Sequence, residues 1–122
     1  MAITLDHKPA FDPANVKDFG TAKIEHRTAA SGLNQLGTYF MTFQDATLTD
    51  PWTVQYEETI YVIEGQARLV IIDGDREQTI LGDADELLVL PQGTTVRYGA
   101  RPGTRLLLSI TPVNWRDVSA AV

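Results

Sequence analysis

Cysteine is absent from this chain of 122 residues. Disulfides, thiolate nucleophiles and zinc–thiolate sites are therefore excluded, while the redox compartment stays open. Positive charge is also scarce, because 10 Lys and Arg residues stand against 16 Asp and Glu residues, which makes the net charge −6. This acidic balance argues against nucleic acid and against anionic membranes as partners.

Long apolar runs are missing as well. Segments such as LLVL at 87–90 are far too short to span a bilayer. The N-terminal stretch MAITLDHKPAF has no apolar run preceded by basic residues, so we expect no secretory signal. The sequence predicts a soluble, cytoplasmic protein of one domain, long enough to build a hydrophobic core.

Short β-prone segments alternate with Gly, Pro or Asp turns along most of the chain. Strands are predicted at 22–28, 36–43, 52–65, 66–73, 76–81, 86–90, 94–100 and 104–113. This spacing, without any long segment of helical periodicity, is typical of an all-β sandwich or barrel. Residues 1–30 are predicted to form an extended arm with a helical turn near Asp12 and Pro13. The barrel is placed at 31–116, and a short helical or frayed tail at 117–122.

The central predicted strand, WTVQYEETIYVIEG at 52–65, carries one carboxylate on an otherwise apolar face. Alternation with period two places the following side chains on that face: Trp52, Val54, Tyr56, Glu58, Ile60 and Val62. Such a face points into a core, so Glu58 is either buried at a cost or lines a pocket.

Two segments resemble the paired motifs of the cupin superfamily. The first motif ends in a strand with the residues Glu58, Tyr61, Val62, Ile63 and Gly65, and the second carries Pro91-Gln92-Gly93 after an apolar strand. The resemblance covers roughly residues 36–115, and it implies a small antiparallel jelly-roll barrel, also called a double-stranded β-helix. Asp85-Glu86 depart from the pattern, because cupins usually place Gly-Asp there.

Within the superfamily, the chain is most similar to the cupins of ethanolamine utilisation, the EutQ family. The segments that carry this similarity are Phe40-Met41, Pro51-Trp52-Thr53, Tyr56-Glu57-Glu58, 62–65, Ile72-Asp73-Gly74, Pro91-Gln92-Gly93 and 112–115. In that family the cupin is usually the C-terminal part of a longer chain. The resemblance implies an accessory role in amino-alcohol or aldehyde catabolism and, more remotely, a kinase activity with acetate and ATP. The predicted arm at 1–30 and the outward Tyr61 and Ile63 also favour a homodimer.

A typical metal-binding cupin places two histidines six and four residues before the motif glutamate, and a third five residues after the motif proline. Here those positions hold Trp52, Val54 and Val96, and only Glu58 remains. Neither Trp nor Val offers a usable lone pair, so we predict no metal site and no cofactor. The two histidines of the chain, His7 and His26, lie outside both motifs, and a surface or structural role is predicted for each.

The same parity places Tyr98 and Val96 of the second motif near Glu58. We predict an apolar pocket for a small organic molecule, with Glu58, Tyr56 and Tyr98 as catalytic candidates. The predicted lining residues are Trp52, Val54, Phe40, Thr42, Arg68 and Val96, although Tyr39, Met41 and Phe43 could face inward instead of Phe40 and Thr42. Burial is expected to raise the pKa of Glu58, which suits a general acid or base, and a tyrosine could stabilise an oxyanion.

A purely structural role is the alternative for each of the same residues. Glu58 could be paired with Arg68 or Arg105, or accept a hydrogen bond from Tyr98, and the tyrosines could be ordinary core aromatics. Two function classes follow. One is a metal-free cupin that binds a small molecule, with or without acid–base chemistry at Glu58. The other is a non-catalytic sensing or assembly subunit.

Overall fold

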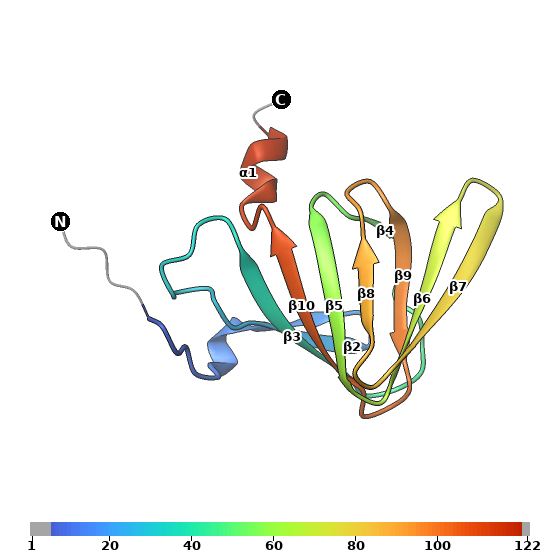
Figure 1. Ribbon diagram of the computed structural model, residues 1–122, viewed down its shortest axis with the longest axis horizontal. Coiled ribbons are helices and arrows are strands. Elements are labelled where there is room, and N and C mark those ends of the chain that lie inside the picture. The colour runs from blue at the N-terminus through green and yellow to red at the C-terminus, as the bar shows by residue number, and fades with distance from the viewer. Residues whose placement is uncertain (1–5, 121–122) are drawn as a thin grey trace.

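The computed structural model describes residues 6–120, which fold into two antiparallel sheets. A six-stranded sheet has the order β1 (Val16–Phe19), β2 (Ala22–His26), β3 (Gly37–Phe43), β10 (Arg105–Thr111), β5 (Glu57–Glu64) and β8 (Leu87–Leu90). A four-stranded sheet has the order β4 (Trp52–Thr53), β9 (Thr95–Ala100), β6 (Gln66–Asp73) and β7 (Arg76–Asp83). Figure 1 shows β6, β7 and β9 on one side of the molecule and β3, β10 and β5 on the other. The predicted all-β jelly-roll architecture is confirmed.

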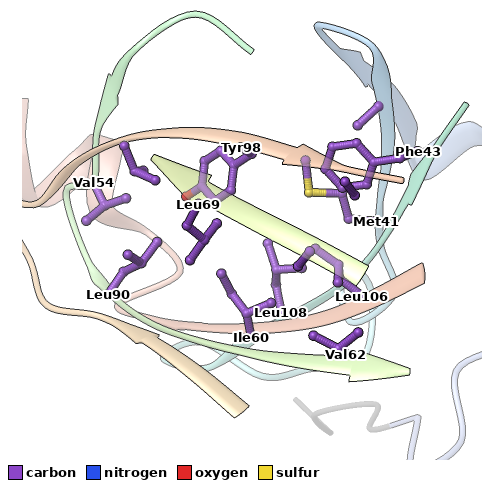
Figure 2. Packing of buried hydrophobic residues seen from close by; sticks show 14 of the residues in the cluster. Met41, Phe43, Val54, Ile60, Val62, Leu69, Leu90, Tyr98, Leu106 and Leu108 are labelled. Carbon is purple, nitrogen blue, oxygen red and sulfur yellow. The ribbon is translucent and has the colours of Figure 1, made fainter. Parts of the chain in front are cut away.

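The core lies between the two sheets, where their inner faces meet. Leu69 and Tyr98 from the four-stranded sheet point toward Ile60, Leu106 and Leu108 from the six-stranded sheet (Figure 2). All five side chains are 3 % exposed or less. Alternation with period two along each strand supplies this core, because successive side chains leave the backbone on opposite faces.

The central segment 52–65 is not one continuous strand, as its alternation predicted. The chain bends at Val54–Tyr56, so that β4 pairs with β9 in the four-stranded sheet and β5 pairs with β8 and β10 in the six-stranded sheet. Val54 donates its N–H to Thr94 (2.9 Å), and its carbonyl accepts from Gly93 (2.8 Å), which holds the bend. A strand that changes sheets makes a corner of the sandwich, and the inward parity is preserved across it.

The extended arm expected for residues 1–30 is not confirmed in the part that the structure describes. A 3-10 turn at Pro13–Asn15 begins as predicted, because the Asp12 carboxylate accepts from the N–H of Ala14 (2.9 Å). The following β1 and β2 form a hairpin, and β2 pairs with β3, so the hairpin extends the six-stranded sheet. Residues 1–5, which belong to the predicted arm, lie outside the described residues.

The C-terminal helix α1 (Trp115–Ala120) follows β10 and stands at one end of the sandwich, near the ends of β10 and β5 (Figure 1). It includes part of the tail predicted at 117–122, of which residues 121–122 are not described. Among residues 6–120, no helix combines the length and the apolar character that crossing a membrane requires.

Candidate ligand-binding cavity

A cavity of about 580 Å³ opens between the inner face of the six-stranded sheet, which includes the β1–β2 hairpin, the residues Trp52 and Tyr98 of the four-stranded sheet, and the start of α1. Its lining comprises Ala14, Asn15, Lys17, Asp18, Phe19, Ile24, His26, Ala29, Tyr39, Met41, Trp52, Tyr56, Glu58, Tyr98, Leu108, Ile110, Trp115 and Arg116. The volume lies in the range of cavities that enclose small organic ligands, and most of the lining is apolar or aromatic.

Aromatic rings dominate the wall next to Glu58. The Trp115 ring meets Trp52 edge-on and Tyr56 at a tilt, with ring centroids 5.6 Å apart in each pair. The indole N–H of Trp52 donates to the hydroxyl of Tyr56 (3.2 Å). Phe19 packs edge-on against Tyr98 with centroids 5.8 Å apart. These contacts restrain the rings, so the wall is formed before any ligand arrives.

Glu58 is the buried carboxyl group of the cavity, with 3 % of the residue exposed. Its Oε1 accepts a hydrogen bond from the Tyr98 hydroxyl at 2.7 Å. Burial raises the pKa of Glu58 from its ordinary 4.5 to about 7, although the bond from Tyr98 favours the carboxylate and works against this rise. At neutral pH the group therefore populates both protonation states and can either accept or donate a proton.

The two tyrosines next to Glu58 keep their protons at neutral pH. Burial, with a smaller effect from the Glu58 charge, raises the pKa of Tyr56 to about 12 and that of Tyr98 further. Tyr98 donates its hydroxyl proton in the hydrogen bond to Glu58. Tyr56 accepts from Trp52 and, among the described hydrogen bonds, donates to no protein group. Its O–H is available to a molecule in the cavity.

The structure pairs Glu58 with a tyrosine and not with an arginine. Arg68 is exposed, on the face of β6 opposite to the buried Ala67 and Leu69. Arg105 lies over the ring of Phe40, with its guanidinium carbon 4.4 Å from the ring centroid. Of the interactions considered from the sequence, only the hydrogen bond from Tyr98 forms within residues 6–120.

Four of the predicted site residues meet in the cavity, namely Trp52, Tyr56, Glu58 and Tyr98. Val54 and Val96 point inward but lie wholly within the packed core, without lining the cavity. Phe40, Thr42 and Arg68, which were also predicted to line the pocket, do not line this cavity either.

Phe40 and Thr42 lie on the opposite face of β3 from Tyr39 and Met41, which do line the cavity. The reason is the pairing of β3 with β10. The apolar alternation Tyr39, Met41 and Phe43 faces the core, so the residues between them face outward.

The sequence interpretation left Tyr39 open as an alternative lining residue, and it missed others, among them His26, Trp115 and Arg116. The sequence held a signal for Tyr39, because the side chains on its face of β3 are apolar without interruption, and such a face is predicted to point inward. His26 shares the parity of Ala22 and Ile24 on β2, which packs against the core. Trp115 and Arg116 carried no comparable signal, because a helix of six residues has too little periodicity to indicate what it covers.

The residues at the cavity do not fit the metal that metal-binding cupins hold. Glu58 is the one oxygen or nitrogen ligand at the four motif positions, and Trp52, Val54 and Val96 occupy the others. Within residues 6–120, no three His, Cys, Asp or Glu side chains gather in an arrangement that could hold a metal ion. The one available ligand is the Glu58 carboxylate, which is already hydrogen-bonded to the Tyr98 hydroxyl, and a divalent metal requires more ligands than this.

Comparison with known proteins places the chain among cupins of one pathway. The family model described as "Ethanolamine utilisation protein EutQ" matches residues 2–117. Acetate kinase EutQ of Salmonella typhimurium is 28% identical over 79 residues, which are 65% of this chain and 32% of that protein. Acetate kinase EutQ of Clostridioides difficile is 28% identical over 81 residues, which are 66% of this chain and 48% of that protein. The matches thus span from about a third to about half of the relatives' length.

Solved structures agree on the fold. The EutQ protein of Clostridium difficile aligns with a TM-score of 0.66 and 24% identity, over 77% of this chain and 64% of that one. Oxalate decarboxylase OxdC of Bacillus subtilis, in a S161A mutant form, aligns with a TM-score of 0.67 and 18% identity, over 80% of this chain and 27% of that one. At these identities the likeness establishes the cupin fold alone.

Proposed function

The chain belongs to the EutQ family of ethanolamine utilisation proteins, and from that premise we propose that its cavity binds a small organic molecule without a metal and exchanges a proton with it at Glu58. The protein then serves as an accessory in the catabolism of amino alcohols, aldehydes or related small molecules. The observation that carries the proposal is a buried carboxyl group that accepts a hydrogen bond from Tyr98 inside an aromatic cavity. Burial raises its pKa to about 7, which suits a general acid or base at neutral pH.

The neighbouring groups supply what a proton transfer needs. As a carboxylate, Glu58 takes a proton from the bound molecule, and the electron pair left behind is delocalised onto an oxygen of that molecule. The O–H of Tyr56 is suited to hydrogen-bond this developing oxyanion, because Tyr56 accepts from Trp52 and, among the described hydrogen bonds, donates its own proton to no protein group. Tyr98 holds the Oε1 of Glu58 in place and stabilises its charged form. Return of the proton from Glu58 closes the cycle.

Acetaldehyde in deuterated water is a direct probe of this chemistry, because abstraction of a methyl proton leads to deuterium incorporation that NMR detects. We expect the protein to accelerate this exchange and Glu58→Gln to lower the rate by about a hundredfold or more. Glu57→Gln, on the exposed side of the same strand, is the matched control and should leave the rate unchanged. Equal rates for both variants would contradict an acid–base role of Glu58.

A non-catalytic assembly subunit is the second candidate, and the edge strand β8 favours it. Leu87 and Val89 are 61% and 63% exposed, and within residues 6–120 no strand pairs with the outer side of β8. An edge strand without charged residues and with exposed apolar side chains is prone to pair with another strand. A second copy of β8 can pair with it in antiparallel orientation about a twofold axis. We propose a homodimer through β8.

Light scattering tests this dimer. The expected mass is that of two chains, and Val89→Lys should reduce it to one chain, because two charges would be buried together at the twofold axis. Thr79→Lys, at an exposed position of β7, is the control with the same change of charge. A mass of one chain for the unchanged protein would refute the dimer.

Acetate kinase activity ranks lower, since it rests on the names of the curated relatives and this chain matches only part of their length. Formation of acetyl phosphate from acetate and ATP by the purified chain would support it. Glu58→Gln would then show whether the cavity is involved.

A further inference from the structure

His26 lies in the same cavity as Glu58, on a different wall. It ends β2 and shares the inward parity of Ala22 and Ile24. Its imidazole stacks on the Tyr39 ring, with centroids 4.3 Å apart and an angle of 16° between the planes. The stack fixes the plane of the imidazole and therefore the directions in which its nitrogens can form hydrogen bonds.

The Nε2 atom of His26 is buried and has no hydrogen-bond partner within residues 6–120. A buried polar atom without a partner is costly and rare in a folded protein, so it needs an explanation. Burial, with a smaller effect from the charge of Lys17, lowers the pKa of His26. The neutral imidazole has one nitrogen that donates and one that accepts, and His26 lines the cavity, so its ring can serve a ligand hydroxyl or amine there in either tautomer.

Glu58 and His26 stand at opposite ends of an apolar stretch. The strands β3 and β10 lie between β2 and β5, which sets the two backbones about 14 Å apart along the sheet. Strand pairing aligns His26 with Tyr39, and Tyr39 with Leu108, while Glu58 is aligned with Ile110. Tyr39, Leu108 and Ile110 line the cavity, so the floor between the two polar ends is apolar.

We infer that His26 is a second polar anchor of the cavity, and that the ligand is a small molecule with hydrogen-bonding groups at both ends joined by an apolar stretch. One end meets Glu58 and the tyrosines, and the other meets the imidazole of His26, which lines the cavity. This inference rests on the proposed function, because it assigns the class of molecule that the same cavity binds. It makes His26 a specificity-determining residue.

Linear diols and the alcohols of matching length separate this inference from binding in general. The probes are 1,4-butanediol, 1,6-hexanediol and 1,8-octanediol, each beside the corresponding 1-alkanol. We expect one diol to bind about five-fold more tightly than its alkanol, which is the gain from one additional neutral hydrogen bond. Both affinities are read from NMR titrations of the unchanged protein.

Imidazole nitrogen shifts report the contact directly. Adding the preferred diol should move a ring-nitrogen resonance of His26, whereas the alkanol should not. The only other histidine, His7, is exposed and serves as an internal control whose resonances stay in place. His26→Phe keeps an aromatic ring for the stack and should abolish the advantage of the diol, while His26→Gln should retain part of it. Thermal unfolding of both variants checks that they are folded, and the nitrogen shifts of the unchanged protein need no variant.

The outcomes distinguish the two proposals. A diol of one length that binds more tightly, shifts a ring nitrogen of His26 and loses its advantage in His26→Phe supports the second anchor. Equal binding of diols and alkanols, or unmoved ring nitrogens of His26, overturns it while leaving ligand binding in the cavity intact. If neither class of alcohol binds at millimolar concentration, both the anchor and the proposed small-molecule cavity are refuted.

Discussion

Glu58→Gln is expected to make the protein more stable at alkaline pH and to leave its stability nearly unchanged at acidic pH. The carboxyl is 3 % exposed, and the Tyr98 hydroxyl is its one hydrogen-bond partner in the described part of the chain. Ionisation of this group must take place inside the core of the folded protein. Glutamine keeps the acceptor oxygen for Tyr98 and removes the ionisation.

The magnitude follows from the two pKa values. Unfolding returns the pKa of Glu58 from about 7 to its ordinary 4.5, a difference that corresponds to about 3 kcal/mol. Between these values the folded protein holds a proton that the unfolded chain has lost, so stability falls as the pH rises. Below the lower value both states are protonated and there is no penalty, and above the upper value the full penalty applies.

Urea unfolding of the unchanged protein and of Glu58→Gln measures this difference across the pH range from about 4 to about 8.5. Other carboxylates also titrate, but their contributions cancel when the two free energies of unfolding are subtracted. The subtracted curve should rise by up to about 3 kcal/mol in favour of the glutamine variant. Glu57→Gln, at the exposed neighbouring position, should give a flat curve.

A flat curve for Glu58→Gln would refute the burial argument, because it would mean that the pKa is the same in both states. A curve of the opposite sign would indicate that a positive charge stabilises the carboxylate in the folded protein. That result would restore the pairing with an arginine that the structure does not show.

Three further predictions concern neighbouring features of the fold. Tyr98→Phe removes the hydrogen-bond donor to Glu58 and should lower the free energy of unfolding by about 1–3 kcal/mol. The loss should be larger at pH 8 than at pH 5, because the hydrogen bond favours the charged form of Glu58. Urea unfolding at both pH values measures the loss, and an equal loss would contradict that preference. Gly65→Ala should destabilise the protein by more than about 2 kcal/mol, because the φ of Gly65 is +87° and a Cβ there would collide with Thr104. Gly74→Ala should cost only about 1 kcal/mol, because Gly74 has a φ of +63° but open space around its Cβ position. Similar losses of stability for the two variants in thermal unfolding would refute the steric argument. Protein purified without added metal should contain far less than one equivalent by elemental analysis, and a full equivalent would overturn the interpretation of positions 52, 54 and 96.

The sequence by itself determined the fold class, most strand positions and the inward carboxylate. Turn residues and period-two alternation are local properties, and the alternation of Tyr56, Glu58 and Ile60 places Glu58 inward in any pairing. The turn at Gly74 and the 3-10 turn at Asp12 were equally local. Apolar parity on β3 and β6 also carried information that the prediction did not use, since an uninterrupted apolar face predicts that Phe40 and Arg68 point outward.

The tertiary structure alone decided which distant side chains share the cavity with Glu58. His26 reaches it because the β1–β2 hairpin continues the six-stranded sheet, and Trp115 reaches it because α1 follows β10 at the open end of the sandwich. The pKa of Glu58 likewise depends on burial by both sheets and on the hydroxyl of Tyr98, 40 residues away in the chain. These relations arise from the closure of the sheets and from pairing between strands far apart in the chain, and the local periodicity of a sequence carries no information about either.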